Sequence, residues 1–85
     1  MLTKIDVTQA DIDMGWRGNC TACPVALALS RITGHYFSVW LRYCYDNKTR
    51  RQYPIPSFIA DRIAAYDCGE VLEPFSFEID LYDVD

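Results

Sequence analysis

The order of apolar and polar positions divides the chain into helical and extended segments, and the first third predicts two helices. In the segment VTQADIDMG, Thr8 is a suitable helix N-cap, and Asp11, three residues later, completes an approximate capping box. Gly15 is expected to end this short helix in a left-handed conformation.

The segment CPVALALSRITG predicts a second helix, which begins with Pro24 and ends at Gly34. Proline is favoured in a first helical turn because an N–H group there has no partner within the helix. Val25, Leu29 and Ile32 recur at helical spacing, and the residues between them leave no polar face in the first turns. We therefore expect this helix to be central and buried.

The middle of the chain changes from a helical to an extended period. Residues 35–45 are rich in aromatic and β-branched side chains, and Asp46, Asn47 and Lys48 are typical of a turn. Residues 50–55 can return as a second strand, so this part of the chain predicts a β-hairpin.

The last third predicts one helix and one strand. In SFIADRIAAYDCG, Ser57 is a suitable N-cap, and Ile59, Ile63 and Tyr66 form one apolar face. The segment PFSFEIDLYD then alternates apolar and polar residues with the period of a half-buried strand. We expect this last strand to pair with the hairpin.

Together these elements predict a single domain, residues 1–85, of the α+β class. The expected order is α-α-β-β-α-β, in which helices cover one face of a three-stranded, mostly antiparallel sheet. A chain of 85 residues that is 51% hydrophobic can bury one modest core.

The uncovered face of this sheet is the expected site of partner binding. Strand alternation turns Phe37, Val39, Leu41, Tyr43 and Tyr45 inward. The opposite set combines aromatic and arginine side chains, a composition that is enriched at protein interfaces. The outward residues are Tyr36, Ser38, Trp40, Arg42, Cys44, Arg50, Gln52, Glu78 and Asp80.

The charge is −4 overall and unevenly distributed. Residues 17–53 carry six Lys and Arg against Asp46 alone, whereas residues 54–85 carry Arg62 against eight acids. Overall acidity argues against general binding of duplex nucleic acid, and the acidic last third favours a basic partner. The first fifteen residues contain no apolar run and no later segment is long enough to span a bilayer, so we expect a cytoplasmic protein.

The cysteine pattern allows three interpretations. In the cytoplasm Cys20, Cys23, Cys44 and Cys68 are expected to be reduced, and buried thiols act as small hydrophobic groups. As zinc ligands, Cys20 and Cys23 lack the second close pair that structural sites commonly have, because the other candidate ligands, Cys44, Cys68 and His35, are lone residues. As a redox dithiol, the same pair stands at a helix N-terminus, where the helix dipole lowers a thiol pKa.

The hairpin also allows a nucleic-acid interpretation. Aromatic platforms next to basic residues bind single strands, although Glu78 and Asp80 on the same face would repel phosphate, so direct binding is not favoured. The basic residues are Arg42, Lys48, Arg50 and Arg51, and the aromatic ones are Trp40, Tyr43 and Tyr53.

Residues typical of an enzyme are missing from the pattern. His35 is the single histidine, and alternation places it on the face opposite Cys44, so we expect a surface or edge histidine and no Cys-His dyad. The sequence has no Gly-rich phosphate loop. We therefore expect a protein without catalytic activity or cofactor.

Over nearly its whole length, the chain resembles a family of small bacteriophage and prophage proteins. The shared features are Cys20-x-x-Cys23-Pro24 with the following Ala-Leu run, and Gly69 followed by Pro74-Phe75-x-Phe77. The resemblance implies a phage origin and action in a bacterial cytoplasm, and it implies no catalytic residue. This chain departs from the family in its aromatic hairpin, which contains Tyr36, Trp40, Tyr43 and Tyr45.

The leading hypothesis is a phage-encoded, non-enzymatic protein that binds and inhibits a host protein, such as a defence nuclease complex, as anti-CRISPR proteins do. The alternatives are a small zinc-stabilised or single-stranded nucleic-acid-binding module and a thiol redox protein that uses Cys20 and Cys23. The candidate partner-binding residues are Tyr36, Trp40, Arg42, Arg50, Glu78 and Asp80, and Asp83 and Asp85 would extend the acidic rim.

Overall fold

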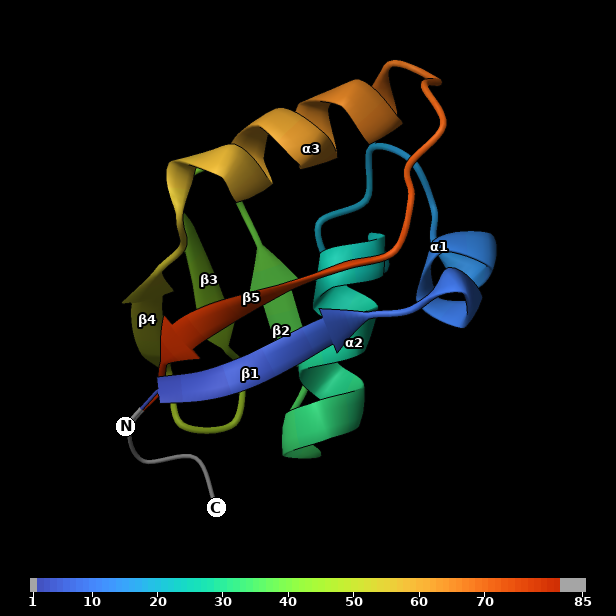
Figure 1. Ribbon diagram of the computed structural model, residues 1–85. Coiled ribbons are helices and arrows are strands. Elements are labelled where there is room, and N and C mark those ends of the chain that lie inside the picture. Colours follow the sequence, from blue (N-terminus) through green and yellow to red (C-terminus); the bar gives the residue numbers. More distant parts are fainter. Residues whose placement is uncertain (1, 82–85) are drawn as a thin grey trace.

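A computed structural model describes residues 2–81 as three helices and five strands (Figure 1). The order is β1 (Leu2–Val7), α1 (Gln9–Met14), α2 (Pro24–Thr33), β2 (Phe37–Val39), β3 (Tyr43–Asp46), β4 (Arg51–Pro54), α3 (Ser57–Asp67) and β5 (Phe75–Asp80).

The α+β class and the three-stranded antiparallel sheet are confirmed, and this sheet has the order β2-β3-β4. The expected position of the last strand is wrong, because β5 pairs antiparallel with β1 and not with the hairpin. β1 was not predicted at all. Its only buried residues are Ile5 and Val7, and Ile5 lies opposite Phe77, a partner that is remote in the sequence.

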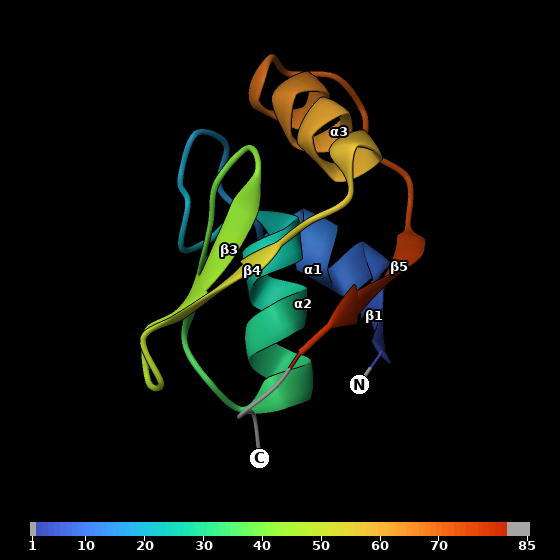
Figure 2. The same ribbon diagram turned by 90° about the vertical axis from the view of Figure 1, so that its left-hand side faces the viewer.

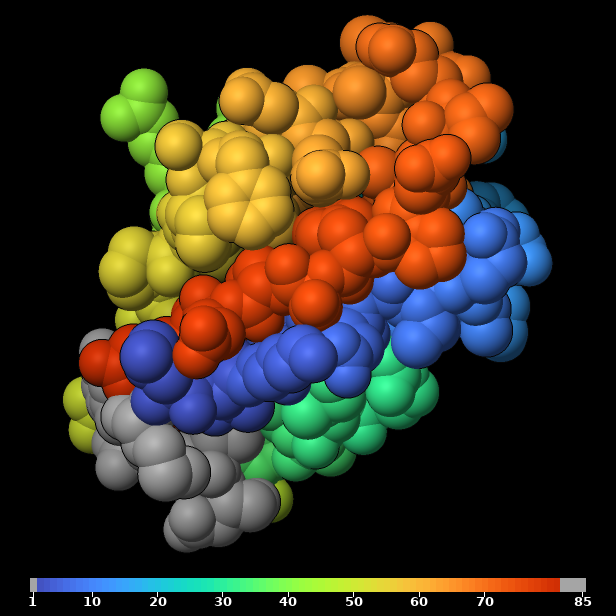
Figure 3. All heavy atoms as spheres, in the orientation of Figure 1, coloured from blue at the N-terminus to red at the C-terminus, as the bar shows by residue number. Residues whose placement is uncertain are grey.

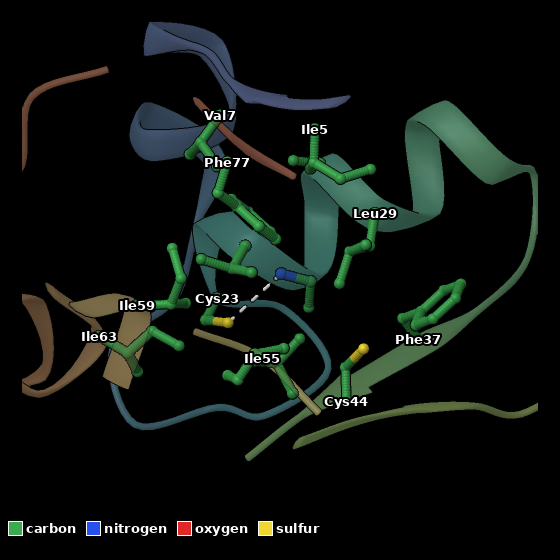
Figure 4. Packing of buried hydrophobic residues seen from close by; sticks show 14 of the residues in the cluster. Ile5, Val7, Cys23, Leu29, Phe37, Cys44, Ile55, Ile59, Ile63 and Phe77 are labelled. Carbon is green, nitrogen blue, oxygen red and sulfur yellow. Dashed lines mark hydrogen bonds between the residues drawn. The ribbon is translucent and has the colours of Figure 1, made fainter. Parts of the chain in front are cut away.

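Helix α2 lies between the two sheets, as Figure 2 shows, and contacts both β1 and β2. Val25, Ala26, Ala28 and Leu29 are buried, which confirms the expected central helix, whereas Ile32 is exposed. Helix α3 lies across one end of both sheets and buries Ile59, Ile63 and Tyr66. The core therefore lies around α2, with α3 closing one end (Figure 4).

The predicted first strand of the hairpin is two strands, β2 and β3, separated by residues 40–42. Phe37 and Val39 are buried as expected, but Leu41 is exposed and Cys44 is completely buried. The turn shifts the alternation by one residue, so every side chain after it changes face. The inward assignment of Leu41, Tyr43 and Tyr45 and the outward assignment of Cys44 are therefore wrong. Ser38, which was also expected to point outward, is buried.

The predicted helix ends are mostly confirmed. Thr8 and Asp11 form the capping box of α1, and Gly34 ends α2 with a φ of 77°. Ser57 is the first residue of α3 and not its N-cap, which is Pro56. Gly15 is not left-handed, since its φ is −70°; glycine is needed there because a Cβ atom would lie 2.8 Å from Cδ of Pro24.

Candidate functional site

The segment of residues 40–42 between β2 and β3, called here the Trp40 turn, is exposed throughout. The side chains of Trp40 and Leu41 are 46% and 61% exposed. Tyr43 follows the turn, and its ring centroid lies 6.4 Å from that of Trp40. The turn thus displays two neighbouring aromatic rings and an aliphatic side chain to solvent.

The backbone of the Trp40 turn is held in place on both sides. Trp40 donates its N–H to the carbonyl oxygen of Tyr43 at 2.8 Å, which closes the turn. Val39 donates to the carbonyl oxygen of Cys20 at 2.7 Å, and the carbonyl oxygen of Arg42 accepts from Ile55 at 3.1 Å. A surface fixed in this way loses little conformational entropy when a partner binds.

The segment that reaches Cys20 is in turn fixed to α3. Arg17 donates from Nε to the carbonyl oxygen of Tyr66 at 2.7 Å, and its guanidinium lies 4.5 Å from the centre of the Tyr66 ring. The N–H of Gly18 donates to Oδ1 of Asp67 at 2.8 Å. The Trp40 turn and the end of α3 are therefore connected through residues 17–20.

Two cavities flank Leu41. The first has a volume of about 200 Å³ and a mainly apolar lining that includes Cys20, Cys23, Val39, Trp40, Leu41 and Ile63. The second, a groove between the turn and α3, has a volume of about 550 Å³ and is lined by Leu41, Arg42, Ile55, Ser57, Ala60, Asp61 and Ala64. Leu41 lines both cavities, so each of them lies next to this exposed apolar side chain.

The six candidate partner-binding residues do not form one surface. Trp40 and Arg42 lie in the Trp40 turn, but Tyr36 and Arg50 lie at the opposite end of the sheet, beside the turn between β3 and β4. Glu78 and Asp80 are exposed on β5, which forms with β1 a continuous band across another part of the molecule (Figure 3). Asp83 and Asp85 are outside the described residues.

The sequence patterns did not predict a buried hydrogen bond between His35 and Asp46. The expectation of a surface or edge histidine is wrong, because His35 is 5% exposed and its Nδ1 lies 2.6 Å from Oδ2 of Asp46. Asp46 also accepts backbone N–H groups from Lys48 and Thr49 at 2.8 and 3.3 Å. Burial opposes ionisation of Asp46, but these hydrogen bonds outweigh it and hold its pKa below the usual value.

This pair has a structural role at the end of the sheet opposite the Trp40 turn. It fastens the segment that follows α2 to the turn after β3. A signal for it was present in the hairpin, because Asp46 lies opposite Phe37 and His35 is two residues before Phe37. Diagonal neighbours of this kind can touch across strands, but they can be recognised only when the register is known.

The buried thiols do not have the properties of a reactive dithiol. Sγ of Cys23 accepts the N–H of Ala26 at 3.4 Å and caps α2, as the dashed line in Figure 4 shows. Burial raises the pKa of Cys23, which is opposite to the expected effect of the helix N-terminus. Burial also raises the pKa of Cys44, to about 12.

Residues 2–81 form neither a cluster of zinc ligands nor a continuous surface of basic and aromatic side chains for nucleic acid. Within residues 2–81, no group of three or more His, Cys, Asp or Glu side chains could hold a metal ion. Tyr53 is completely buried against Phe37, so it is unable to stack on a base. Lys48 and Arg50 flank the turn after β3, whereas Arg42 lies in the Trp40 turn, so the basic cluster is divided.

A scan against protein-family models and searches of curated proteins and of solved structures find no match. The resemblance to phage proteins therefore stays a prediction. Among the helices formed by residues 2–81, none has the length and apolar character needed to cross a membrane.

Proposed function

We propose that this chain is a non-enzymatic interaction protein, encoded by a phage, that binds and inhibits a host bacterial protein through the Trp40 turn. The observation that carries the proposal is the half-exposed Trp40, beside the Tyr43 ring, on a turn whose backbone is fixed by three hydrogen bonds. Tryptophan and tyrosine are enriched among the residues that contribute most of the binding energy of an interface.

The environment of Trp40 supports its role as the central contact. Its ring is half exposed, packs against Tyr43 and lines the first cavity together with Val39 and Cys20. A partner side chain that fills this cavity would bury the exposed part of the indole ring. Tryptophan and tyrosine give large contact areas for few rotatable bonds, so binding costs little entropy.

The charge distribution supports a basic target. Glu78 and Asp80 are exposed on β5, and the chain carries a net charge of −4. An acidic protein associates faster with a basic surface than with an acidic one, and nucleic-acid-binding surfaces are basic. We therefore propose a nucleic-acid-binding effector, such as a defence nuclease complex, as the class of target.

Capture from a bacterial lysate tests the binding surface. Immobilised wild-type protein should retain one host protein, identified by mass spectrometry, and Trp40→Ala should weaken its affinity for that protein at least about thirtyfold, as expected for a central tryptophan (about 2 kcal/mol or more). The matched control is Leu2→Ala, because Leu2 is 66% exposed on β1, far along the chain from the turn.

One result would contradict the assignment of the Trp40 turn as the binding surface. If a folded Trp40→Ala variant retains the same host protein as well as Leu2→Ala does, the Trp40 turn is not the binding site. The class of target has its own test. Expression of the wild-type chain should restore plaque formation by a phage that a nuclease-based defence restricts, and the Trp40→Ala chain should not restore it.

A further inference from the structure

The groove between the Trp40 turn and α3 has two chemically different walls. One wall carries Leu41, which is 61% exposed, and the exposed Arg42. The other wall is α3, where Ala60 and Ala64 lie one turn apart with the exposed Asp61 beside them. One wall thus presents a projecting aliphatic side chain and a positive charge. The other presents small apolar side chains and a negative charge.

The two charged groups of this groove, Arg42 and Asp61, have no ion-pair partner among residues 2–81. Both side chains line the same groove. Arg42 on one wall and Asp61 on the other can therefore each form an ion pair with a molecule that covers the groove.

A second copy of the chain has the complementary arrangement. A two-fold axis that runs along the groove places the turn of one copy over α3 of its partner, and the same contact is repeated by symmetry. Leu41 then packs on the small side chains of Ala60 and Ala64, which allow a close approach. Arg42 of each copy faces Asp61 of the other, so the interface contains two equivalent pairs of opposite charge.

We propose that the protein forms a two-fold symmetric homodimer through this groove, in which Arg42 of each copy pairs with Asp61 of the other. This inference goes beyond the proposed function and does not depend on it. Trp40 lines the first cavity and is not among the residues that line the groove, so the dimer leaves two Trp40 sites.

Charge exchange at the two positions tests the dimer. Sedimentation equilibrium of the wild-type chain should give the mass of a dimer. Arg42→Asp and Asp61→Arg should each raise the dissociation constant at least about tenfold, because each creates two like-charged contacts across the axis. An equimolar mixture of the two single variants should form a heterodimer, since every contact in that pair again joins opposite charges.

The aliphatic contact is tested with a matched pair of variants. Leu41→Ala should weaken the dimer, whereas Leu2→Ala should leave it unchanged, although the two leucines are similarly exposed. A wild-type chain that remains a monomer at its highest soluble concentration overturns the proposal and assigns the groove to another partner. A dimer that survives both charge variants, or a mixture of the two that stays monomeric, overturns it as well.

Discussion

His35 and Asp46 form a buried hydrogen bond in which Nδ1 and Oδ2 are 2.6 Å apart, and Asp46 has no exposed surface. The pair connects the residue that follows the C-cap of α2 with the last residue of β3. Because two backbone N–H groups also bond the carboxylate, its negative charge is stabilised in the folded state far more than in the unfolded chain.

Asp46→Asn should therefore lower the free energy of unfolding at neutral pH by about 2 kcal/mol, the value typical of a buried hydrogen bond to a charged group. The pKa of Asp46 is lower in the folded state than its ordinary 3.8. The stabilisation that the ionised Asp46 gives to the fold is thus complete at a pH above its pKa in the unfolded chain. It is lost as the pH falls through its pKa in the folded protein. Urea unfolding at a series of pH values should show the wild-type advantage shrinking below about pH 4.

The control for this measurement is Glu73→Gln, which removes an exposed carboxylate. Its effect on the free energy of unfolding should stay within about 0.5 kcal/mol at each pH. An equal loss in both variants, or an Asp46→Asn difference that does not depend on pH, would show that Asp46 is not held as a stabilised carboxylate.

The sequence alone predicted those features that depend on neighbouring residues. The capping box of Thr8 and Asp11, the first turn of α2 at Pro24 and its end at Gly34 all follow from local backbone chemistry. Local patterns also identified the exposed Trp40 and the buried face of α3.

Features that depend on contacts between residues far apart in the sequence could not be predicted from local patterns. β1 has only two buried side chains and pairs with β5 at the other end of the chain, so its local pattern is weak. The turn at residues 40–42 moved Cys44 into the core and Leu41 out of it, because one change of register inverts every later position. The two cavities beside Leu41 depend on how α3 lies over the turn, which no local pattern contains.

Gly15 and Gly18 should respond in opposite ways to the size of a new side chain. A Cβ atom at Gly15 would lie 2.8 Å from Cδ of Pro24 and 3.0 Å from the hydroxyl of Tyr66, so steric overlap is the penalty. Gly18 has open space around it but a φ of 70°, where backbone strain is the penalty.

We expect Gly15→Ala to cost about 1–3 kcal/mol of stability and Gly15→Asn to cost more, because the larger side chain increases the overlap. Gly18→Ala should cost about 1 kcal/mol and Gly18→Asn less, because asparagine tolerates the left-handed region. Thermal unfolding of the four variants measures this crossover. The same rank order of Ala and Asn at both positions would contradict the assigned causes.

The contact between Asp11 and Arg31 should stabilise the packing of α1 on α2. Nη2 of Arg31 donates to Oδ2 of the buried Asp11 at 3.0 Å and to the carbonyl oxygen of Asp6 at 2.7 Å. Burial alone would raise the pKa of Asp11, but hydrogen bonds from Arg31 and Thr8 lower it. A double-mutant cycle of Asp11→Asn and Arg31→Ala should give a coupling energy of about 1 kcal/mol.

An exposed pair in the same chain provides the comparison for that cycle. Lys4 and Asp6 are 3.7 Å apart, with side chains that are 69% and 58% exposed. A cycle on this pair should give no measurable coupling, since solvent and salt screen it. If both cycles give the same coupling energy, the burial of Asp11 does not strengthen its contact with Arg31.

The four thiols should react with a neutral-pH alkylating reagent in an order set by burial. Cys68 is exposed and should be labelled first in the folded protein, whereas Cys23 and Cys44 should be labelled only when the chain unfolds. A pKa of about 12 for Cys44, against 9.0 for an unperturbed thiol, reduces its thiolate fraction roughly 1000-fold at neutral pH. Peptide mass mapping after timed quenching gives the rate at each position, and labelling in urea confirms that all four thiols are present and free. Rapid labelling of folded Cys23 would contradict its position as the buried cap of α2 and would restore the redox interpretation of Cys20 and Cys23.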